Sequence, residues 1–317
     1  MISVSQADTY ELVAPHFVSD RLARRRLRHM KERVIEMALF LAALVSVATT
    51  VGIVVILLRE SLVFFQHVPL WDFLTDTQWT PLFADAHYGI LPLLSGTLVS
   101  SGVALLVAIP LGTIIAIYLS EFAPFSVREV AKPFLELLGG VPTIVYGYFA
   151  LVFVTPLLQK IYPGLPGFNL LSAGLVMGIM IIPYVSSISE DAMRAVPMNL
   201  REGSYAMGGT RLQTALRVVT PAAFSGIAAA YILGISRAVG ETMIVAVAGG
   251  MQPNFTLNPL EPAATITSYI VQVALGDLPH GSIGYQTIFA AGLTLALLTL
   301  FFNMLGHLLR KRYRQAY

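Results

Sequence analysis

Residues 222–247 read AAFSGIAAAYILGISRAVGETMIVAV, an almost wholly apolar stretch that contains two charged residues, Arg237 and Glu241. A helix needs roughly 20 apolar residues to cross about 30 Å of bilayer hydrocarbon. The stretch is long enough to span a membrane, so it predicts a transmembrane helix that carries two charges.

The composition of the whole chain agrees with a membrane protein. Of its 317 residues, 56% are apolar and 12% are charged, whereas soluble domains average about 25% charged residues. So few charges cannot cover a soluble globule of this size. The absence of cysteine excludes disulfides, thiolate metal sites, iron–sulfur clusters and cysteine nucleophiles.

Five further segments are also apolar and long enough to span a membrane, and none alternates polar and apolar residues as barrel strands do. We therefore predict an all-α membrane protein with six transmembrane helices. Gly174 and Gly178 stand at the spacing typical of close helix packing. The predicted spans are 34–58, 90–119, 141–158, 170–188, 222–247 and 285–309.

The basic residues predict the orientation, because cytoplasmic segments of membrane proteins carry the excess of Lys and Arg. Of the 20 Lys and Arg residues, Arg59 and Lys160 fall on one predicted side and Arg237 lies within a span. All the others lie in 1–33, 120–140, 189–221 and 310–317. We expect a basic cytoplasmic tail (1–33), a transmembrane domain (34–309) and a second cytoplasmic tail (310–317).

The segments between the spans differ by side. The outer segment 59–89 contains Trp71 and Trp79, which favour the bilayer interface, and the outer segment 248–284 contains an apolar helix candidate at 263–275. Each of these two outer segments is either a plain connecting loop or a docking surface for an extracellular partner. The inner segment 189–221 is broken by Pro197 and Gly208-Gly209, which predicts a short helix at 199–207. A compact helix held between two spans can act as a lever.

Several kinds of catalytic chemistry are missing from the sequence. No lysine follows a glycine, so there is no P-loop for ATP. No two histidines stand at i, i+4, and no G-x-S-x-G motif occurs. We therefore predict a transport subunit and neither an enzyme nor a metal protein.

Arg237 and Glu241 are the candidate functional residues within the membrane. A charge at a helix centre costs about 2.5–3.5 kcal/mol on insertion scales, so such residues face a bundle interior or a wet cavity. Their i, i+4 spacing permits a structural ion pair. Alternatively, the Arg237 guanidinium faces an anion path, with Glu241 orienting it and Thr242 adding a hydroxyl.

The inner segment resembles a known transporter motif. Residues 202–208 (EGSYAMG), followed nine residues later by 218–221 (VVTP), are similar to the E-A-A-x-x-x-G…I-x-L-P motif of type I ABC importer permeases. The sequence departs from that motif at Gly203, Ser204, Val218 and Thr220. The resemblance implies a coupling helix seated on a separate ATPase subunit, which would bind ATP and Mg. The motif residues it assigns to ATPase coupling are Glu202, Gly203, Ser204, Ala206, Gly208 and Pro221.

A second resemblance concerns the substrate. Residues 135–147 (LELLGGVPTIVYG) and 236–243 (SRAVGETM) are similar to the permeases of phosphate-importing Pst transporters, the PstC-like type in particular. This implies a bacterial inner-membrane protein that works by alternating access. Its partners would be a PstA-like permease, a PstB-like ATPase dimer and a PstS-like phosphate-binding protein. Arg237, Glu241 and Thr242 are the predicted substrate-binding residues. Permeases for phosphonate, sulfate or molybdate, a proton-coupled carrier or channel, and a phosphate-sensing subunit are the alternatives.

Overall fold

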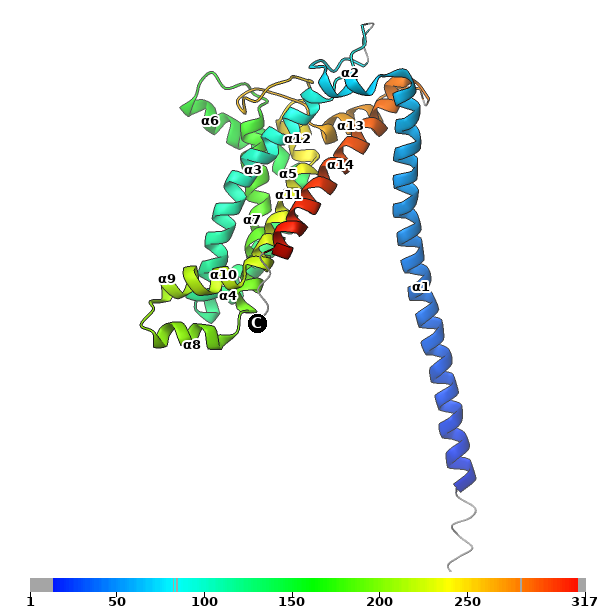
Figure 1. Cartoon of the computed structure of the whole chain (residues 1–317), viewed down its shortest axis with the longest axis vertical. Helices are drawn as coiled ribbons and strands as arrows, with labels where there is room; N and C mark the ends of the chain where they lie inside the picture. The colour runs from blue at the N-terminus through cyan, green and yellow to red at the C-terminus, as the bar shows by residue number, and fades with distance from the viewer. Residues whose placement is uncertain (1–13, 82, 84, 280, 313–317) are drawn as a thin grey trace, which may run out of the picture. The chain divides into compact units, whose positions relative to one another are not determined.

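The computed structural model describes residues 14–81, 83, 85–279 and 281–312. Within these residues all regular elements are helices, joined by irregular connections, and an isolated bridge links Trp79 to Tyr88 (Figure 1). In chain order the elements are α1 (Ala14–His67), α2 (Leu70–Thr75), α3 (Leu91–Ile117), η1 (Tyr118–Phe122), α4 (Phe125–Gly140), α5 (Thr143–Phe149), η2 (Ala150–Val154), α6 (Thr155–Ile161), α7 (Leu170–Arg194), α8 (Met198–Ala206), α9 (Arg211–Thr214), η3 (Ala215–Val219), α10 (Thr220–Ala222), α11 (Phe224–Val239), α12 (Met243–Ala248), α13 (Ile266–Ala274) and α14 (Ile283–Arg312).

The chain forms two units, Met1–Ile56 and Leu57–Tyr317, and each is described by itself. The first contains most of α1, which is longer at both ends than the predicted span 34–58. The reason lies in the sequence, because no proline interrupts residues 16–68. The predicted tails 1–33 and 310–317 lie partly outside the described residues.

The second unit is built around the packing of α3 against α7. Added Cβ atoms at Gly174 and Gly178 would lie 2.7 Å from Val103 Cβ and 2.8 Å from Val107 Cβ, respectively. These two glycines therefore let α7 approach α3 closely, which confirms the prediction that they are packing residues. α11 packs against both helices, and α14 packs against α11.

The fifth predicted span is wrong as a single straight helix over 222–247. The structure bends by 74° between Arg211–Ala222 and Phe224–Val239, and the helix ends at Val239. A separate short helix, α12, follows at Met243. Among the described residues, five helices are long and apolar enough to cross a membrane, and the number is six if the bent pair counts as one span. The six-helix prediction is thus confirmed with one broken member.

The end of the unit that carries α2 and α13 has its own apolar cluster. Trp79 is 2% exposed there and packs edge-to-face on Phe73 and Tyr269. The ring of Trp79 therefore fills a core, whereas Trp71 is exposed; the position of segment 59–89 at the bilayer interface stays a prediction. The helix expected at 263–275 is confirmed as α13.

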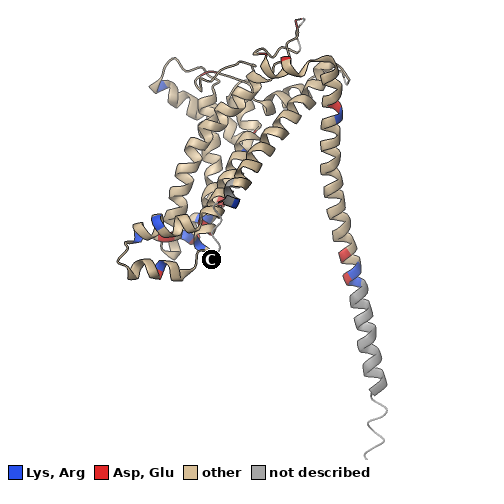
Figure 2. Cartoon of the chain, viewed as in Figure 1, with Lys and Arg blue, Asp and Glu red and all other residues tan. Residues whose placement is uncertain are grey.

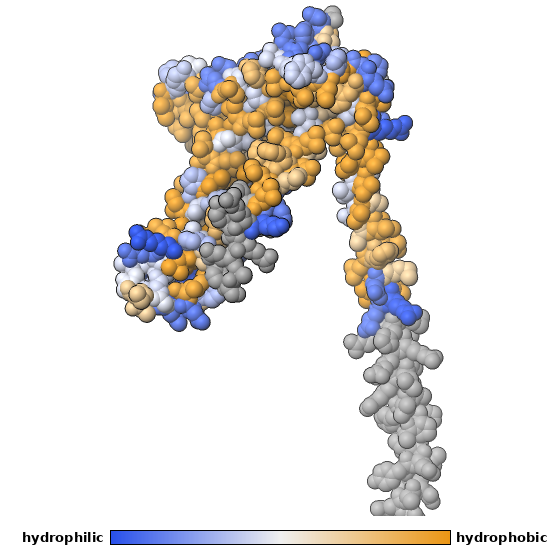
Figure 3. Space-filling model, viewed as in Figure 1, coloured by the Kyte–Doolittle hydropathy of each residue, from blue (hydrophilic) through white to orange (hydrophobic). Residues whose placement is uncertain are grey.

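Charges in the second unit are concentrated at the ends of the helices. Figure 2 shows Lys and Arg gathered where α4, α8 and α9 lie, and Figure 3 shows apolar side chains along the flanks of the helices. This distribution suits a bundle whose flanks contact lipid and whose ends contact water.

Candidate translocation and coupling sites

Arg237 lies near the end of α11, where its guanidinium faces an aromatic ring. Its Cζ atom stands 5.1 Å from the centre of the Tyr184 ring on α7, within the range of a cation–π interaction. Tyr184 in turn donates its hydroxyl to the Gly139 carbonyl at 3.1 Å, at the end of α4. The Nε atom of Arg237 is buried without a hydrogen-bond partner. The guanidinium is thus held by a ring while one of its donors is unused.

Glu241 does not pair with Arg237 in the part of the chain that the structure describes. Its Oε1 atom accepts hydrogen bonds from the backbone N–H groups of Met243 and Ile244, at 3.0 and 3.3 Å. The carboxylate therefore satisfies two of the free donors at the start of α12. The expected i, i+4 ion pair fails because α11 ends at Val239, so the two residues do not share a helix.

The break between α11 and α12 is fixed by hydroxyl groups. Thr267 of α13 donates to the Glu241 carbonyl at 2.7 Å, and Thr242 donates to the Gly240 carbonyl at 3.3 Å. Glycine at position 240 favours the interruption, because it has a poor helix propensity. Arg237, Glu241 and Thr242 are close in sequence, but the latter two serve the break itself.

The predicted short helix in the inner segment is confirmed as α8, one residue earlier than the expected 199–207. Pro197 precedes it, and Gly208 follows it with φ of 81°, a left-handed conformation that suits glycine. Ser204 hydrogen-bonds Thr214 at 2.8 Å, which joins α8 to α9. Among the other predicted coupling residues, Glu202, Gly203, Ala206, Gly208 and Pro221 are exposed.

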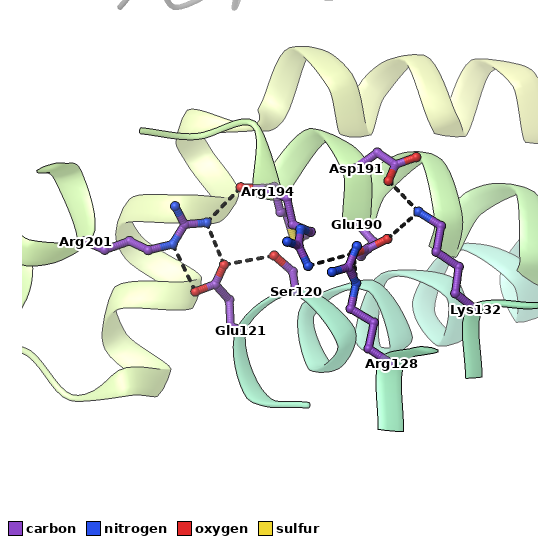
Figure 4. A network of polar contacts seen from close by, with 9 residues as sticks. Ser120, Glu121, Arg128, Lys132, Glu190, Asp191, Arg194 and Arg201 are labelled. Carbon is purple, nitrogen blue, oxygen red and sulfur yellow. Dashed lines mark hydrogen bonds and ion pairs between the residues drawn. The ribbon is translucent and has the colours of Figure 1, made fainter. Parts of the chain in front are cut away.

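Two buried acidic residues near α8 were not predicted from the sequence (Figure 4). Glu121, in η1, pairs with Arg201 of α8 at 2.8 Å. Glu190, fully buried on α7, pairs with Arg128 and Lys132 of α4 at 2.8 and 2.9 Å. The sequence did offer one sign of them, because each acidic residue follows an apolar span and lies in a basic segment. Their partners could not be identified, because these lie 58 to 80 residues away in sequence.

The family of this chain is shown by comparison with known proteins. Residues 108–315 match the family described as binding-protein-dependent transport system inner membrane component. The chain belongs to this family. It is therefore an ABC importer permease subunit, as the coupling motif predicted, and members of the family work with ATPase and substrate-binding proteins.

Several curated relatives are similar along most of this permease. A probable ABC transporter permease of Bacillus subtilis, YqgH, is 36% identical, with 93% of this chain and 96% of the relative covered. The phosphate transport system permease protein PstC of Mesorhizobium japonicum is 34% identical, over 72% and 75%. PstC 1 of Mycobacterium tuberculosis is 33% identical, over 73% and 79%.

Solved structures share the fold of this permease. A chain of the bacterial alginate ABC transporter, in complex with a periplasmic protein, superposes with a TM-score of 0.59 at 17% identity, covering 88% of this chain and 96% of that one. A chain of the inward-facing MetNI methionine transporter gives 0.52 at 18% identity, covering 72% and 95%. These likenesses establish the type I importer permease fold. No cluster of three or more potential metal ligands occurs among the described residues.

Proposed function

We propose that this permease carries inorganic phosphate across a bacterial inner membrane, with Arg237 as its principal anion contact. The proposal is supported by the several PstC relatives and by the geometry of Arg237. A guanidinium with an unused buried donor suits an oxyanion, because it forms charge-assisted and often bidentate hydrogen bonds. Glu241 and Thr242, at the chain break that follows the helix of Arg237, complete the predicted substrate-binding set.

The transport cycle we propose uses two permeases and an ATPase pair. A PstS-like protein delivers phosphate to the outer side, between this chain and a PstA-like paralogue. The PstB-like ATPase subunits bind ATP and Mg, and their closure moves α8. Both termini face the cytoplasm in this arrangement. Because Arg237 rests on Tyr184, an arriving phosphate competes with a ring and not with a carboxylate.

The test is phosphate uptake by the assembled importer with Arg237 substituted. Hydrogen bonds to charged groups contribute about 1.5–3 kcal/mol, so Arg237→Gln is expected to lower uptake at limiting phosphate about tenfold or more. Arg237→Lys keeps the charge and loses the planar fork, and a smaller loss is expected. Lys160→Gln, on α6, is the control. Wild-type uptake in both Arg237 variants would contradict the proposal.

A double substitution tests the role of Glu241. Since the structure has no ion pair between the two side chains, adding Glu241→Gln is not expected to restore uptake to Arg237→Gln. Restoration would show that the pair forms during transport and that Arg237 is structural. Competition by phosphonate, sulfate or molybdate, if stronger than by phosphate, would reassign the substrate.

A further inference from the structure

Arg201 is the inward-facing charged residue of α8. Its side chain is 11% exposed, and its Nη2 and Nε atoms contact the two oxygens of Glu121 at 2.8 and 3.3 Å. The neighbouring Glu202 is exposed. The guanidinium and the carboxylate thus meet in a two-pronged arrangement, which fixes orientation as well as distance.

The same guanidinium also binds the end of α7. Its Nη1 atom donates to the Val196 carbonyl at 2.6 Å, and Nη2 donates to the Met193 carbonyl at 2.9 Å. Met193 lies in the last turn of α7, where carbonyls lack their usual partners within the helix, and Val196 lies two residues after the helix ends. Arg201 therefore donates to the carbonyls around this helix end. One side chain therefore joins α8 to α7 and to η1, which continues α3.

This junction matters because the backbone alone holds α8 weakly. Pro197 and Gly208 bracket the helix, and neither connection contains regular structure. By contrast, α3 and α7 form the most extensive helix pair in the described part of the chain. α7 also carries Tyr184, on which Arg237 rests. A displacement of α8 that is passed to α7 therefore reaches the candidate phosphate contact.

We propose that Arg201, with Glu121 as its partner, is a positioning residue that makes α8, α3 and α7 move as one body, so that ATP hydrolysis is converted into transport. The inference rests on the proposed function to the extent that α8 receives the motion of an ATPase. Arg201 touches neither phosphate nor ATP in this role. Substitution of Arg201 therefore separates ATP hydrolysis from phosphate uptake, and it leaves both the phosphate contact and the ATP site intact.

The experiment measures ATP hydrolysis and phosphate uptake on the same proteoliposomes of the complete importer. Couplings between protein sites commonly amount to about fivefold or more, and we expect Arg201→Gln and Glu121→Gln to lower uptake per ATP by at least that factor. Arg201→Lys should give an intermediate value. Lys132→Gln is the matched control, because it removes the two ion pairs that Lys132 of α4 makes with Glu190 and Asp191 of α7 and leaves α8 untouched.

A cross-link covers the case in which the glutamine variants assemble poorly. The chain has no cysteine, and a cavity of about 420 Å³ borders both residues, so a short bis-maleimide can join Cys residues in a Glu121→Cys, Arg201→Cys variant. The link should raise uptake per ATP relative to the same sample before linking.

Two outcomes would overturn the proposal: a wild-type ratio in the glutamine variants, or a ratio that the link does not change. A wild-type importer that hydrolyses ATP on addition of its binding protein but takes up no phosphate would contradict the proposed function alone. The ratio would then be measured with the anion that is transported.

Discussion

At the scale of single residues, charged side chains in this permease do different work according to their partners. Arg237 rests on a ring and keeps an unpaired buried Nε donor, whereas each guanidinium nitrogen of Arg201 donates to a carboxylate or a carbonyl. Sequence reasoning found Arg237 because a charge in an apolar run is conspicuous. It missed the pairing of Arg201 with Glu121, because nothing in sequence spacing indicates a contact across 80 residues.

Gly203 gives a prediction at this scale. It lies inside α8, and an added Cβ would meet nothing within 4 Å. Alanine is favoured over glycine in a helix interior by about 0.8–1.0 kcal/mol, so Gly203→Ala should raise the melting temperature of this chain purified without the ATPase subunits.

Gly209→Ala is the matched contrast. A Cβ there would lie 2.7 Å from Ser204 Oγ and 2.9 Å from the Ser204 carbonyl oxygen, so this variant should melt lower than wild type. Equal melting temperatures for the two variants would show that the packing around α8 is not as described.

At the scale of elements, the spans were predictable and their breaks were not. Hydrophobicity and length identified six crossing segments, and Pro197 with Gly208 located α8 to within one residue. The break after α11 was not predicted, because it depends on hydrogen bonds from side chains to the backbone. The Glu241 carboxylate accepts from the first N–H groups of α12, and the Thr267 hydroxyl donates to the Glu241 carbonyl. The burial of Trp79 was not predicted for a similar reason, because its core is formed with α13, which is distant in sequence.

The segment between α2 and α3 gives a pH prediction. A hydrogen bond of 2.7 Å to Asp76 raises the pKa of His87 above its ordinary value. Because the pKa of His87 is higher in the folded state, its contact with Asp76 stabilises the fold fully below the unfolded-state pKa of about 6.5. This stabilisation is lost as the pH rises through the folded-state pKa of His87.

Trp79 lies beside this contact, in the bridge to Tyr88, and serves as a reporter. In a Trp71→Phe background its fluorescence should change as pH rises above about 6.5. The change should move to lower pH in Asp76→Asn, where His87 loses its closer acidic partner and keeps only Asp85 at 3.8 Å. A titration unaffected by that substitution would refute the assignment.

At the scale of the whole molecule, basic residues gather at one end of the second unit (Figure 2). By the excess of Lys and Arg in cytoplasmic segments, we expect this end to face the cytoplasm. The family and its fold followed from the spacing of a motif matched at Glu202, Gly208 and Pro221, because the coupling segment is short and continuous in sequence. Contacts with other subunits produce no comparable continuous motif, so the sequence did not identify them.

Cysteine labelling tests this orientation, since the chain has no cysteine of its own. Trp71 and Leu212 are 74% and 55% exposed at opposite predicted sides. Trp71→Cys should react with an impermeant maleimide in intact cells, and Leu212→Cys only after permeabilisation. The reverse pattern would invert the topology.

The residues at the two ends of α8 restrict which sequence changes this helix can accept. Pro197 and Gly208 set where the helix begins and ends, while Arg201 is fixed in rotation by Glu121. Each residue turns a helix by about 100°, so one inserted residue before position 201 would swing the guanidinium away from its carboxylate. This element can therefore vary by replacement of residues, but a change in its length would disconnect it from the membrane helices.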